Sequence, residues 1–235
     1  MNPVDKNKYL NSYLLIGNSR WHWAFKDING WEFLDTKIHN ERLNASKIPL
    51  LAWAAVGEIP KDIILNKSLQ ISLTDVPLLK MPSWLGIDRA LGGWRAFKKA
   101  KESSTLHPNG LLVADAGTIL SITKISANGE FLGGQLSAGL DLQLRAMSQY
   151  TQNLSYPYSD DFPNERFPKN TSGAMKQGCL QGLAGCLKKA QEDAKAPIFI
   201  CGGDAQIIFD CLKKDGLEMF LHPNLVLEGM IDITN

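Results

Sequence analysis

The run Val113-Ala114-Asp115-Ala116-Gly117-Thr118 decides the fold class of this chain of 235 residues. It continues an apolar stretch that starts at Leu111, and it ends in small residues and a hydroxyl. This pattern is typical of a buried β-strand whose carboxyl end opens onto a ligand. An aspartate there, beside backbone that can be approached closely, suits the phosphates of a nucleotide and a cation. A turn in which Asp115 only binds local amides remains the alternative.

The same order of features occurs near the N-terminus. An apolar strand at 13–16 stops at Gly17-Asn18-Ser19, and a strand of alternating large and small residues follows at 21–25. In the second half, the strand predicted at 119–125 follows its glycine turn in the same way. Gly17, Asn18 and Ser19 could bind phosphate, although a plain hairpin turn is the more common use of such residues. The weak repeat predicts an α/β protein of two related lobes around a cleft.

The polar connection at 103–110 ends in proline and glycine, so we place the lobes at residues 1–105 and 106–235. A strand at 50–56 lacks alternation, which predicts burial on both faces. The other predicted strands are at 31–34, 71–74, 111–114, 131–134 and 198–200. The predicted helices are at 86–102, 140–150 and 171–194, with one more after Asp204.

Composition excludes several classes of function. Lys and Arg total 25 against 24 for Asp and Glu, so no basic excess predicts binding to nucleic acid or to anionic lipid. No stretch is apolar for the roughly 20 residues that span a bilayer. The four cysteines form no Cys-x-x-Cys pair and the four histidines are scattered. We therefore expect a cytoplasmic protein with reduced, buried thiols and no membrane partner, which acts on small molecules.

Asp88 and Arg89 stand at the start of the helix predicted at 86–102. An Asp in a first helical turn commonly satisfies backbone amides and the helix dipole. The functional alternative is that Asp88 accepts a proton from a hydroxyl while Arg89 binds an anionic substrate with its planar fork. These two residues alone leave both interpretations open.

The helix predicted at 171–194 carries a stripe of small residues. They recur at steps of three and four residues, at Ala174, Gly178, Gly182 and Gly185. An apolar stripe lies beside them, at Met175, Cys179, Leu183 and Cys186. We slightly favour an internal packing face for the small residues, and a helix pair across a homodimer axis is the alternative.

The order of the motifs along the chain resembles the type III pantothenate kinases. The similarity runs from about residue 13 to the end, and the Gly-x-Asp-Arg motif is its most specific feature. The motifs that carry it are Gly17-Asn18-Ser19, Gly86-Ile87-Asp88-Arg89, Asp115-Ala116-Gly117-Thr118, Gly133-Gly134, Asn170-Thr171, Gly202-Gly203-Asp204 and the closing segment Pro223 to Met230.

The resemblance implies two duplicated lobes of the ribonuclease H-like, actin-like ATPase fold, in the superfamily of acetate and sugar kinases, Hsp70 and actin. It also implies a homodimer that uses ATP to phosphorylate pantothenate to 4'-phosphopantothenate, the first step of coenzyme A biosynthesis. Asp88 would be the catalytic base, and Thr171 would come from the partner subunit. Pantothenate would contact Leu79, Gly86, Ile87, Asp88, Arg89 and Thr171.

The same resemblance implies where ATP and its cations bind. Asp115 would hold a monovalent cation, K⁺ or NH₄⁺, and Mg²⁺ would accompany the phosphates. The residues that would contact ATP are Gly17, Asn18, Ser19, Thr118, Gly202 and Gly203.

Three positions depart from the pattern of the family. Leu15 stands where relatives usually have an Asp that helps to hold magnesium, and a leucine coordinates no cation. Leu79 stands where an aromatic residue is common, and Ala138 replaces a usual proline. Two alternatives therefore stay open: a catalytically impaired binding or regulatory protein on the same scaffold, and an actin-like kinase acting on another small hydroxylated acid.

Overall fold

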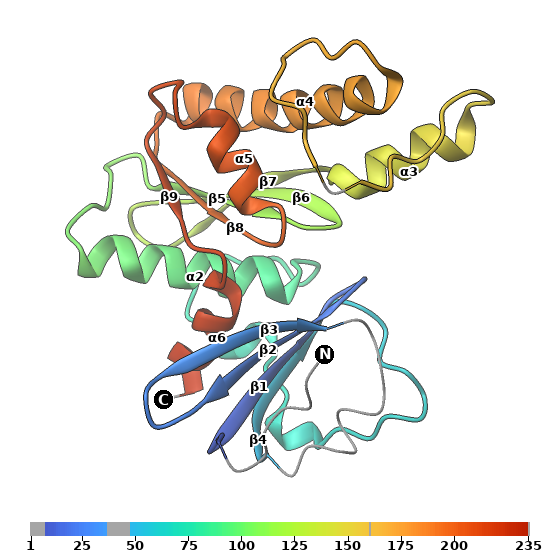
Figure 1. The fold of residues 1–235 in the computed structure, drawn as a ribbon. Helices are drawn as coiled ribbons and strands as arrows, with labels where there is room; N and C mark the ends of the chain where they lie inside the picture. The colour runs from blue at the N-terminus through green and yellow to red at the C-terminus, as the bar shows by residue number, and fades with distance from the viewer. Residues whose placement is uncertain (1–7, 37–47, 160, 235) are drawn as a thin grey trace. The chain divides into compact units, whose positions relative to one another are not determined.

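A computed structural model describes residues 8–36, 48–159 and 161–234 and contains two mixed β-sheets (Figure 1). The chain divides into two compact units, one made of Met1–Arg95 with Asn224–Asn235 and the other of Ala96–Pro223. The predicted lobe boundary at 105/106 remains a prediction. The C-terminal residues make more contacts with the N-terminal unit than with the residues just before them in sequence, so they belong to the first unit.

The first unit is built on a sheet of four strands (Figure 1). The strands are β1 (Asn11–Ile16), β2 (Trp21–Lys26), β3 (Trp31–Thr36) and β4 (Leu50–Ala55). Their order is β3-β2-β1-β4, with β4 parallel to β1 and the other pairs antiparallel. Alternation along β2 places Trp21, Trp23 and Phe25 on one face, where they form a core with Leu14 and Ile16.

One prediction for this unit holds over most of its strand, and one is wrong. β4 is an edge strand, yet Ala52, Trp53 and Ala54 alternate between its two faces and are all buried, as predicted. Only the start of the strand departs from the prediction, since Leu51 is 42% exposed. The strand predicted at 71–74 is replaced by a short 3-10 helix, Leu73–Asp75. The carboxylate of Asp75 accepts the backbone N–H of Ser72 at 2.7 Å, which favours a helical turn over an extended chain. A second 3-10 helix spans Lys67–Leu69.

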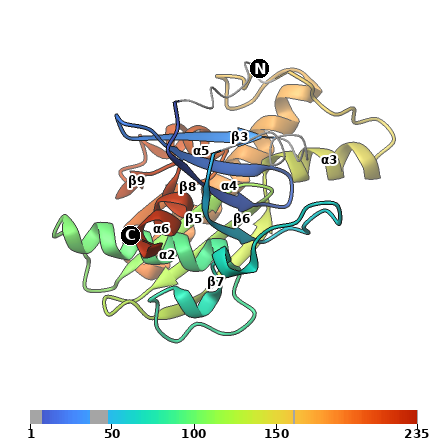
Figure 2. The same cartoon turned by 90° about the horizontal axis from the view of Figure 1, so that it is seen from below.

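The last helix of the chain, α6 (Leu225–Thr234), contacts β1, β2 and β4 (Figure 2). It also packs on the start of α2 (Ile87–Glu102), because Gly229 has no side chain. A Cβ at Gly229 would lie 2.5 Å from the carbonyl oxygen of Leu91. Trp94 Nε1 donates a hydrogen bond to Asp232 at 3.0 Å. This C-terminal segment is therefore part of the first unit, although it is far from the rest of that unit in sequence.

The second unit repeats the strand order of the first. Its strands are β5 (Leu111–Ala116), β6 (Ile119–Ile125), β7 (Phe131–Ala138), β8 (Ile198–Cys201) and β9 (Met219–Leu221). The order β7-β6-β5-β8 matches β3-β2-β1-β4 in both sequence and direction, and β9 extends it. The predicted duplication is thus visible in the topology.

Three helices belong wholly to the second unit: α3 (Leu140–Tyr150), α4 (Thr171–Ala194) and α5 (Ala205–Leu212). Their bounds agree with the predicted helices at 140–150 and 171–194. α4 and α5 lie on one face of the sheet (Figure 1), where Leu183 and Leu187 join a core with Ile198 and Ile200. Within the described residues, no helix is long and apolar enough to cross a membrane.

The stripe of small residues on α4 does not form an internal packing face, so that prediction is wrong. Ala174, Gly178, Gly182 and Gly185 are all exposed, and a Cβ at any of the three glycines would meet nothing within 4 Å. All four cysteines are free thiols, as expected, but Cys186 is exposed rather than buried. The reason is that the sheet covers only the opposite side of α4.

The strand that carries Asp115 depends on Gly110, which has a positive φ of 78°. A Cβ at this position would lie 1.9 Å from the carbonyl oxygen of Ile125. Gly216 has a similar φ of 72° but open space around it, so it is a matched control. We expect Gly216→Ala to cost about 1 kcal/mol from backbone strain alone. Gly110→Ala should cost roughly 3 kcal/mol or more, because backbone must also move. Denaturant unfolding of both variants measures the difference, and equal losses would contradict the packing described.

Candidate functional site

Asp115 lies near the carboxyl end of β5 and is partly buried. It pairs with Ser121 on β6 and with Cys201 on β8. Gly202, with φ of 91°, follows β8 directly, and a Cβ there would lie 2.4 Å from the Asp115 carboxylate. Only glycine allows the chain to pass this close to the Asp115 side chain, which explains why glycine follows Cys201 at position 202.

The turn after β5 is held at the same end of the sheet. Gly139, at the start of α3, donates its N–H to the carbonyl oxygen of Thr118 at 2.9 Å. A Cβ at Gly139 would lie 2.0 Å from the carbonyl oxygen of Gly117. Asp204 donates its N–H to the carbonyl oxygen of Ala116 at 2.9 Å. The predicted residues Asp115, Thr118, Gly202 and Gly203 are therefore brought to one sheet edge.

The first unit repeats this arrangement around the turn after β1. Gly17 donates its N–H to the carbonyl oxygen of Arg20 at 3.0 Å and so closes the turn that contains Asn18 and Ser19. Gly57, just after β4, packs on this turn: a Cβ there would lie 2.5 Å from the carbonyl oxygen of Gly17.

Gly57 and Gly139 are functional candidates that sequence reasoning missed. The available signal was a glycine that closely follows a strand, which marks a close approach of backbone.

Asp88 is in the first turn of α2, as predicted. One of its carboxylate oxygens accepts the backbone N–H of Arg89 at 2.8 Å. An N-cap side chain instead accepts the N–H of a residue two or three positions further along the chain. A Cβ at Gly86 would lie 2.5 Å from the same oxygen. Gly86 therefore leaves room for the Asp88 side chain in its present position.

Burial sets the electrostatics of this pair. Desolvation raises the pKa of Asp88, opposed by the hydrogen bond from the Arg89 amide and by the charge of Arg89. Arg89 is also buried, and desolvation lowers its pKa. A carboxylate with a raised pKa is a better proton acceptor near neutral pH than an exposed one. The geometry thus favours the functional interpretation of Asp88 over simple capping.

The predicted site residues fall into two sets, one in each unit. Ile87 is buried beside Asp88, and Leu79 is 53% exposed. Thr171 is the exposed first residue of α4, where Asn170 caps the helix by accepting the N–H of Gly173. The set in the first unit is Gly17, Asn18, Ser19, Leu79, Gly86, Ile87, Asp88 and Arg89. The set in the second unit is Asp115, Thr118, Thr171, Gly202 and Gly203.

Sequence reasoning also missed Lys176 and Gln177, two buried polar residues of α4. Their amine and amide groups donate hydrogen bonds to backbone carbonyls of the connection between α3 and α4, which leads into Thr171. The four carbonyls belong to alternate residues, namely Ser159, Asp161, Pro163 and Glu165. This contact orders the chain just before Thr171.

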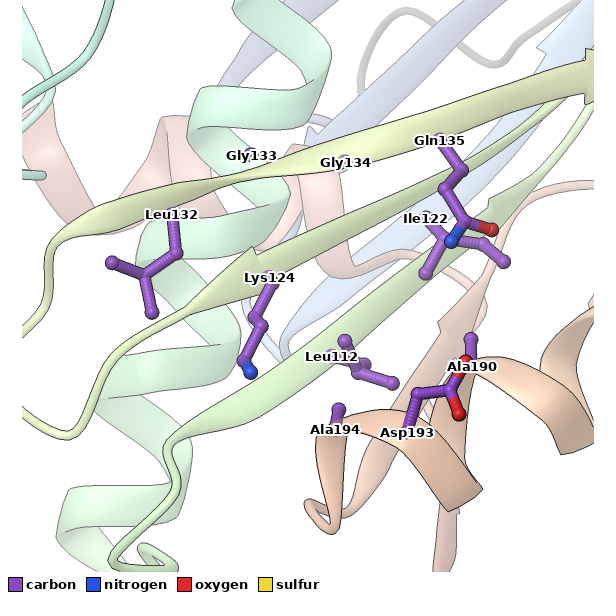
Figure 3. A pocket seen from close by; sticks show the side chains of 10 residues that line it. All are labelled: Leu112, Ile122, Lys124, Leu132, Gly133, Gly134, Gln135, Ala190, Asp193 and Ala194. Atoms are coloured by element: carbon purple, nitrogen blue, oxygen red, sulfur yellow. The ribbon is translucent and has the colours of Figure 1, made fainter.

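A pocket of about 220 Å³ lies between the β5-β6-β7 face and the end of α4 (Figure 3). Lys124 and Gln135 extend from the sheet toward α4, which contributes Asp193. Gly133 and Gly134 line it, so their missing side chains help to form it. None of the predicted catalytic, ATP-binding or pantothenate-binding residues lines this pocket.

The raised pKa of Asp88 makes a prediction about stability. Because the carboxyl group is easier to protonate in the folded state, its contribution to stability is fully present below the unfolded pKa and is lost as pH rises through the folded value. Asp88→Asn removes the charge and keeps an oxygen that can accept the Arg89 amide. The melting temperature of Asp88→Asn relative to the unchanged protein should therefore be higher at pH 8 than at pH 4. A difference that is constant with pH would show that Asp88 carries no burial penalty.

Comparison with known proteins assigns the family. The family profile of type III pantothenate kinases matches residues 52–193, a range that contains Asp88, Asp115 and Thr171. A type III pantothenate kinase of Thermosynechococcus vestitus is 30% identical over 224 residues, which cover 91% of this chain and 84% of that protein. A second, from Synechococcus elongatus, is 29% identical and covers 92% of this chain and 93% of that protein.

Solved structures confirm the fold. A Campylobacter jejuni protein assigned to the Baf family of transcriptional activators has a TM-score of 0.65 at 20% identity, over 94% of this chain and 96% of that one. A Sinorhizobium meliloti protein assigned as a 2-dehydro-3-deoxygalactonokinase has a TM-score of 0.56 at 12% identity, over 95% and 97%. The predicted actin-like ATPase fold is confirmed, and the chain belongs to the type III pantothenate kinase family.

Proposed function

We propose that this protein transfers the γ-phosphoryl group of ATP to pantothenate, which gives 4'-phosphopantothenate and ADP. The single observation that carries the proposal is the Gly86-to-Arg89 arrangement. There a partly buried Asp88 carboxylate with a raised pKa lies beside a buried arginine, within the range that matches the family. The combination supports binding an anionic substrate and orienting its hydroxyl group.

In the proposed reaction, the hydroxyl oxygen of pantothenate forms a bond to the γ-phosphorus as the bond to the β–γ bridging oxygen breaks. The hydroxyl proton passes to the Asp88 carboxylate, and ADP takes the electron pair of the broken bond. Phosphoryl transfer has a loose transition state, so positioning and charge neutralisation supply most of the catalysis. Arg89 would pair with the carboxylate of pantothenate, since a guanidinium fixes direction as well as charge.

The residues that we propose for nucleotide binding lie at a sheet end in each unit. Thr118, Gly202 and Gly203 present a hydroxyl and closely packed backbone beside Asp115, and the Gly17-Asn18-Ser19 turn presents amides and short polar side chains. These are the groups that bind phosphate at turns and strand ends. ATP use follows from the family, and the assignment to individual residues is our proposal.

The donor set near Asp115 fits a cation held jointly with phosphates. Among the described residues, no three Asp, Glu, His or Cys side chains gather as a metal site. Mg²⁺ needs no such cage, because it is usually bound through one or two carboxylates, water and substrate phosphates. Asp115 would hold K⁺, NH₄⁺ or Mg²⁺ beside the Gly202 backbone, where a Cβ would fill the space next to its oxygen. Such a cation neutralises phosphate charge.

A kinase assay tests the proposal. The protein incubated with ATP, Mg²⁺, K⁺ and pantothenate should yield 4'-phosphopantothenate, and a panel of related hydroxy acids should react more slowly. Asp88→Asn should lower kcat by at least about 100-fold, the usual range for loss of a general base. Asp210→Asn, on the exposed face of α5, is the matched control and should retain activity.

The alternative of an impaired binding protein gives a different outcome in the same assay. Calorimetry would then show binding of ATP or pantothenate without product under any cation, including NH₄⁺ in place of K⁺. That result would overturn the proposed activity. Leu15 motivates the comparison, because it leaves the strand end of the first unit without a carboxylate on β1.

We also propose that the protein is a cytoplasmic homodimer and that the α4 stripe lies at its interface. The stripe is exposed, with open space around its glycines, and it starts close to Thr171, which would contribute to the partner's substrate site. Small residues permit close approach of two helices. The cytoplasm supplies ATP and keeps the four free thiols reduced.

Gly182→Lys tests this interface. A lysine in the middle of the stripe would introduce a charge and a long side chain, so the dissociation constant of the dimer should rise at least about 10-fold, equivalent to about 1.4 kcal/mol. Gln206→Lys, on α5, is the control and should leave the dimer intact. Sedimentation equilibrium measures both. A dimer unaffected by Gly182→Lys would place the interface elsewhere.

A further inference from the structure

Three residues form a row across the first sheet, on the same face. Leu15 on β1 pairs directly with His22 on β2, and His22 pairs directly with Asp35 on β3. Residues directly opposite one another on neighbouring strands point to the same face of a sheet. His22 therefore lies between Leu15 and Asp35, opposite the face that holds the tryptophan core of Trp21 and Trp23.

His22 and Asp35 are bonded to one another. His22 Nδ1 lies 2.7 Å from Asp35 Oδ1, and this hydrogen bond is the largest cause of a lowered pKa of Asp35. Asp35 therefore stays a carboxylate that can only accept, which assigns the proton to Nδ1. Arg20, in the turn after β1, lies 4.0 Å from the other Asp35 oxygen. The pair is half-exposed, so solvent and ligands can reach it.

The second ring nitrogen of His22 faces the turn that we propose binds phosphate. A Cβ at Gly17 would lie 3.2 Å from His22 Nε2, so the ring is in contact with the backbone of the turn. In the part of the chain that the structure describes, Nε2 has no hydrogen-bond partner. An unpaired nitrogen, oriented by a carboxylate and set against a phosphate-binding turn, is placed to meet a ligand.

The duplication shows what position this row occupies. Leu15 is the fifth residue of β1, and Asp115 is the fifth residue of β5, the equivalent strand of the second unit. Asp115 is paired with Ser121, as Leu15 is paired with His22. At this end of the sheet, the second unit carries its polar group, Asp115, on its first strand. The first unit carries its polar group, His22, on the neighbouring strand β2.

We infer that His22, oriented by Asp35, is a phosphate-binding residue of the nucleotide site and donates a hydrogen bond from Nε2 to a phosphate oxygen of ATP. The inference rests on the proposed role of the Gly17 turn in ATP binding. Donation from Nε2 as well as from Nδ1 requires a hydrogen on each nitrogen, and a carboxylate on one side of the ring with a phosphate on the other stabilises that cationic form. Arg20 adds a positive charge at the turn. Asp35 does not touch the ligand, so it is a positioning residue.

The chemistry favours phosphate over a metal ion as the ligand of Nε2. Mg²⁺ prefers oxygen ligands, and the described residues gather no third Asp, Glu, His or Cys near the pair. A charge-assisted hydrogen bond to an anion needs only one donor and suits a half-exposed site beside backbone amides.

Calorimetry with ATP, ADP and adenosine tests the inference without requiring turnover. His22→Ala should weaken ATP binding at least about 10-fold, the effect of losing a hydrogen bond to a charged group. Adenosine binding should not change, because adenosine has no phosphate. His22→Gln keeps an N–H donor and should recover part of the loss. Asp35→Asn should have a smaller effect than His22→Ala. His107→Ala is the control, since His107 lies in the exposed loop before β5.

Steady-state kinetics supplies the second measurement. His22→Ala should raise KM for ATP, leave KM for pantothenate unchanged and retain most of kcat at saturating ATP. If the unchanged protein binds ATP but makes no product, the proposed kinase function fails while the calorimetric test of His22 still stands. Equal loss of ATP and adenosine binding, or a lower melting temperature with unchanged ATP affinity, would reduce His22–Asp35 to a structural pair and overturn the inference.

Discussion

Each unit depends on the parallel pairing of its first strand with a later one, β1 with β4 and β5 with β8. The antiparallel hairpins form from residues close in sequence, but these two pairings join segments separated by at least 30 residues and by a crossover. Parallel pairing aligns the carboxyl ends of both strands at one edge. It is this alignment that brings Gly57 against the Gly17 turn and Gly202 against Asp115.

The glycines at these edges are the physical link between fold and chemistry. Gly57, Gly139 and Gly202 each approach a neighbouring backbone carbonyl more closely than a Cβ would allow. Backbone packed in this way places its amides and carbonyls against one another without side chains in between. In a phosphoryl transfer, where positioning supplies most of the rate, such placement is directly useful.

The two units use the same edge with different polar groups. The second unit places a carboxylate on its first strand, at Asp115. The first unit has Leu15 there and carries its polar group as the His22–Asp35 pair on the neighbouring strands. A carboxylate favours a cation, whereas an imidazole oriented by a carboxylate can donate to an anion. Leu15 therefore stands beside a different polar group, the His22–Asp35 pair, and not only in place of a metal ligand.

Local pattern by itself determined much of this protein. The periodicity of residues 86–102 and 171–194 predicted both helices to within a residue at the start of the first. The apolar run before Asp115 predicted its strand, because helix and strand periods depend only on neighbouring residues. The motif series led to the family.

Only the tertiary structure decided the rest. It showed that α6 packs with the first unit, that the α4 stripe is exposed and that residues 73–75 form a turn of helix. It also brought His22 to Asp35 and Lys176 to the chain before Thr171. These features depend on contacts between segments far apart along the chain, and local periodicity does not predict which segments will make contact.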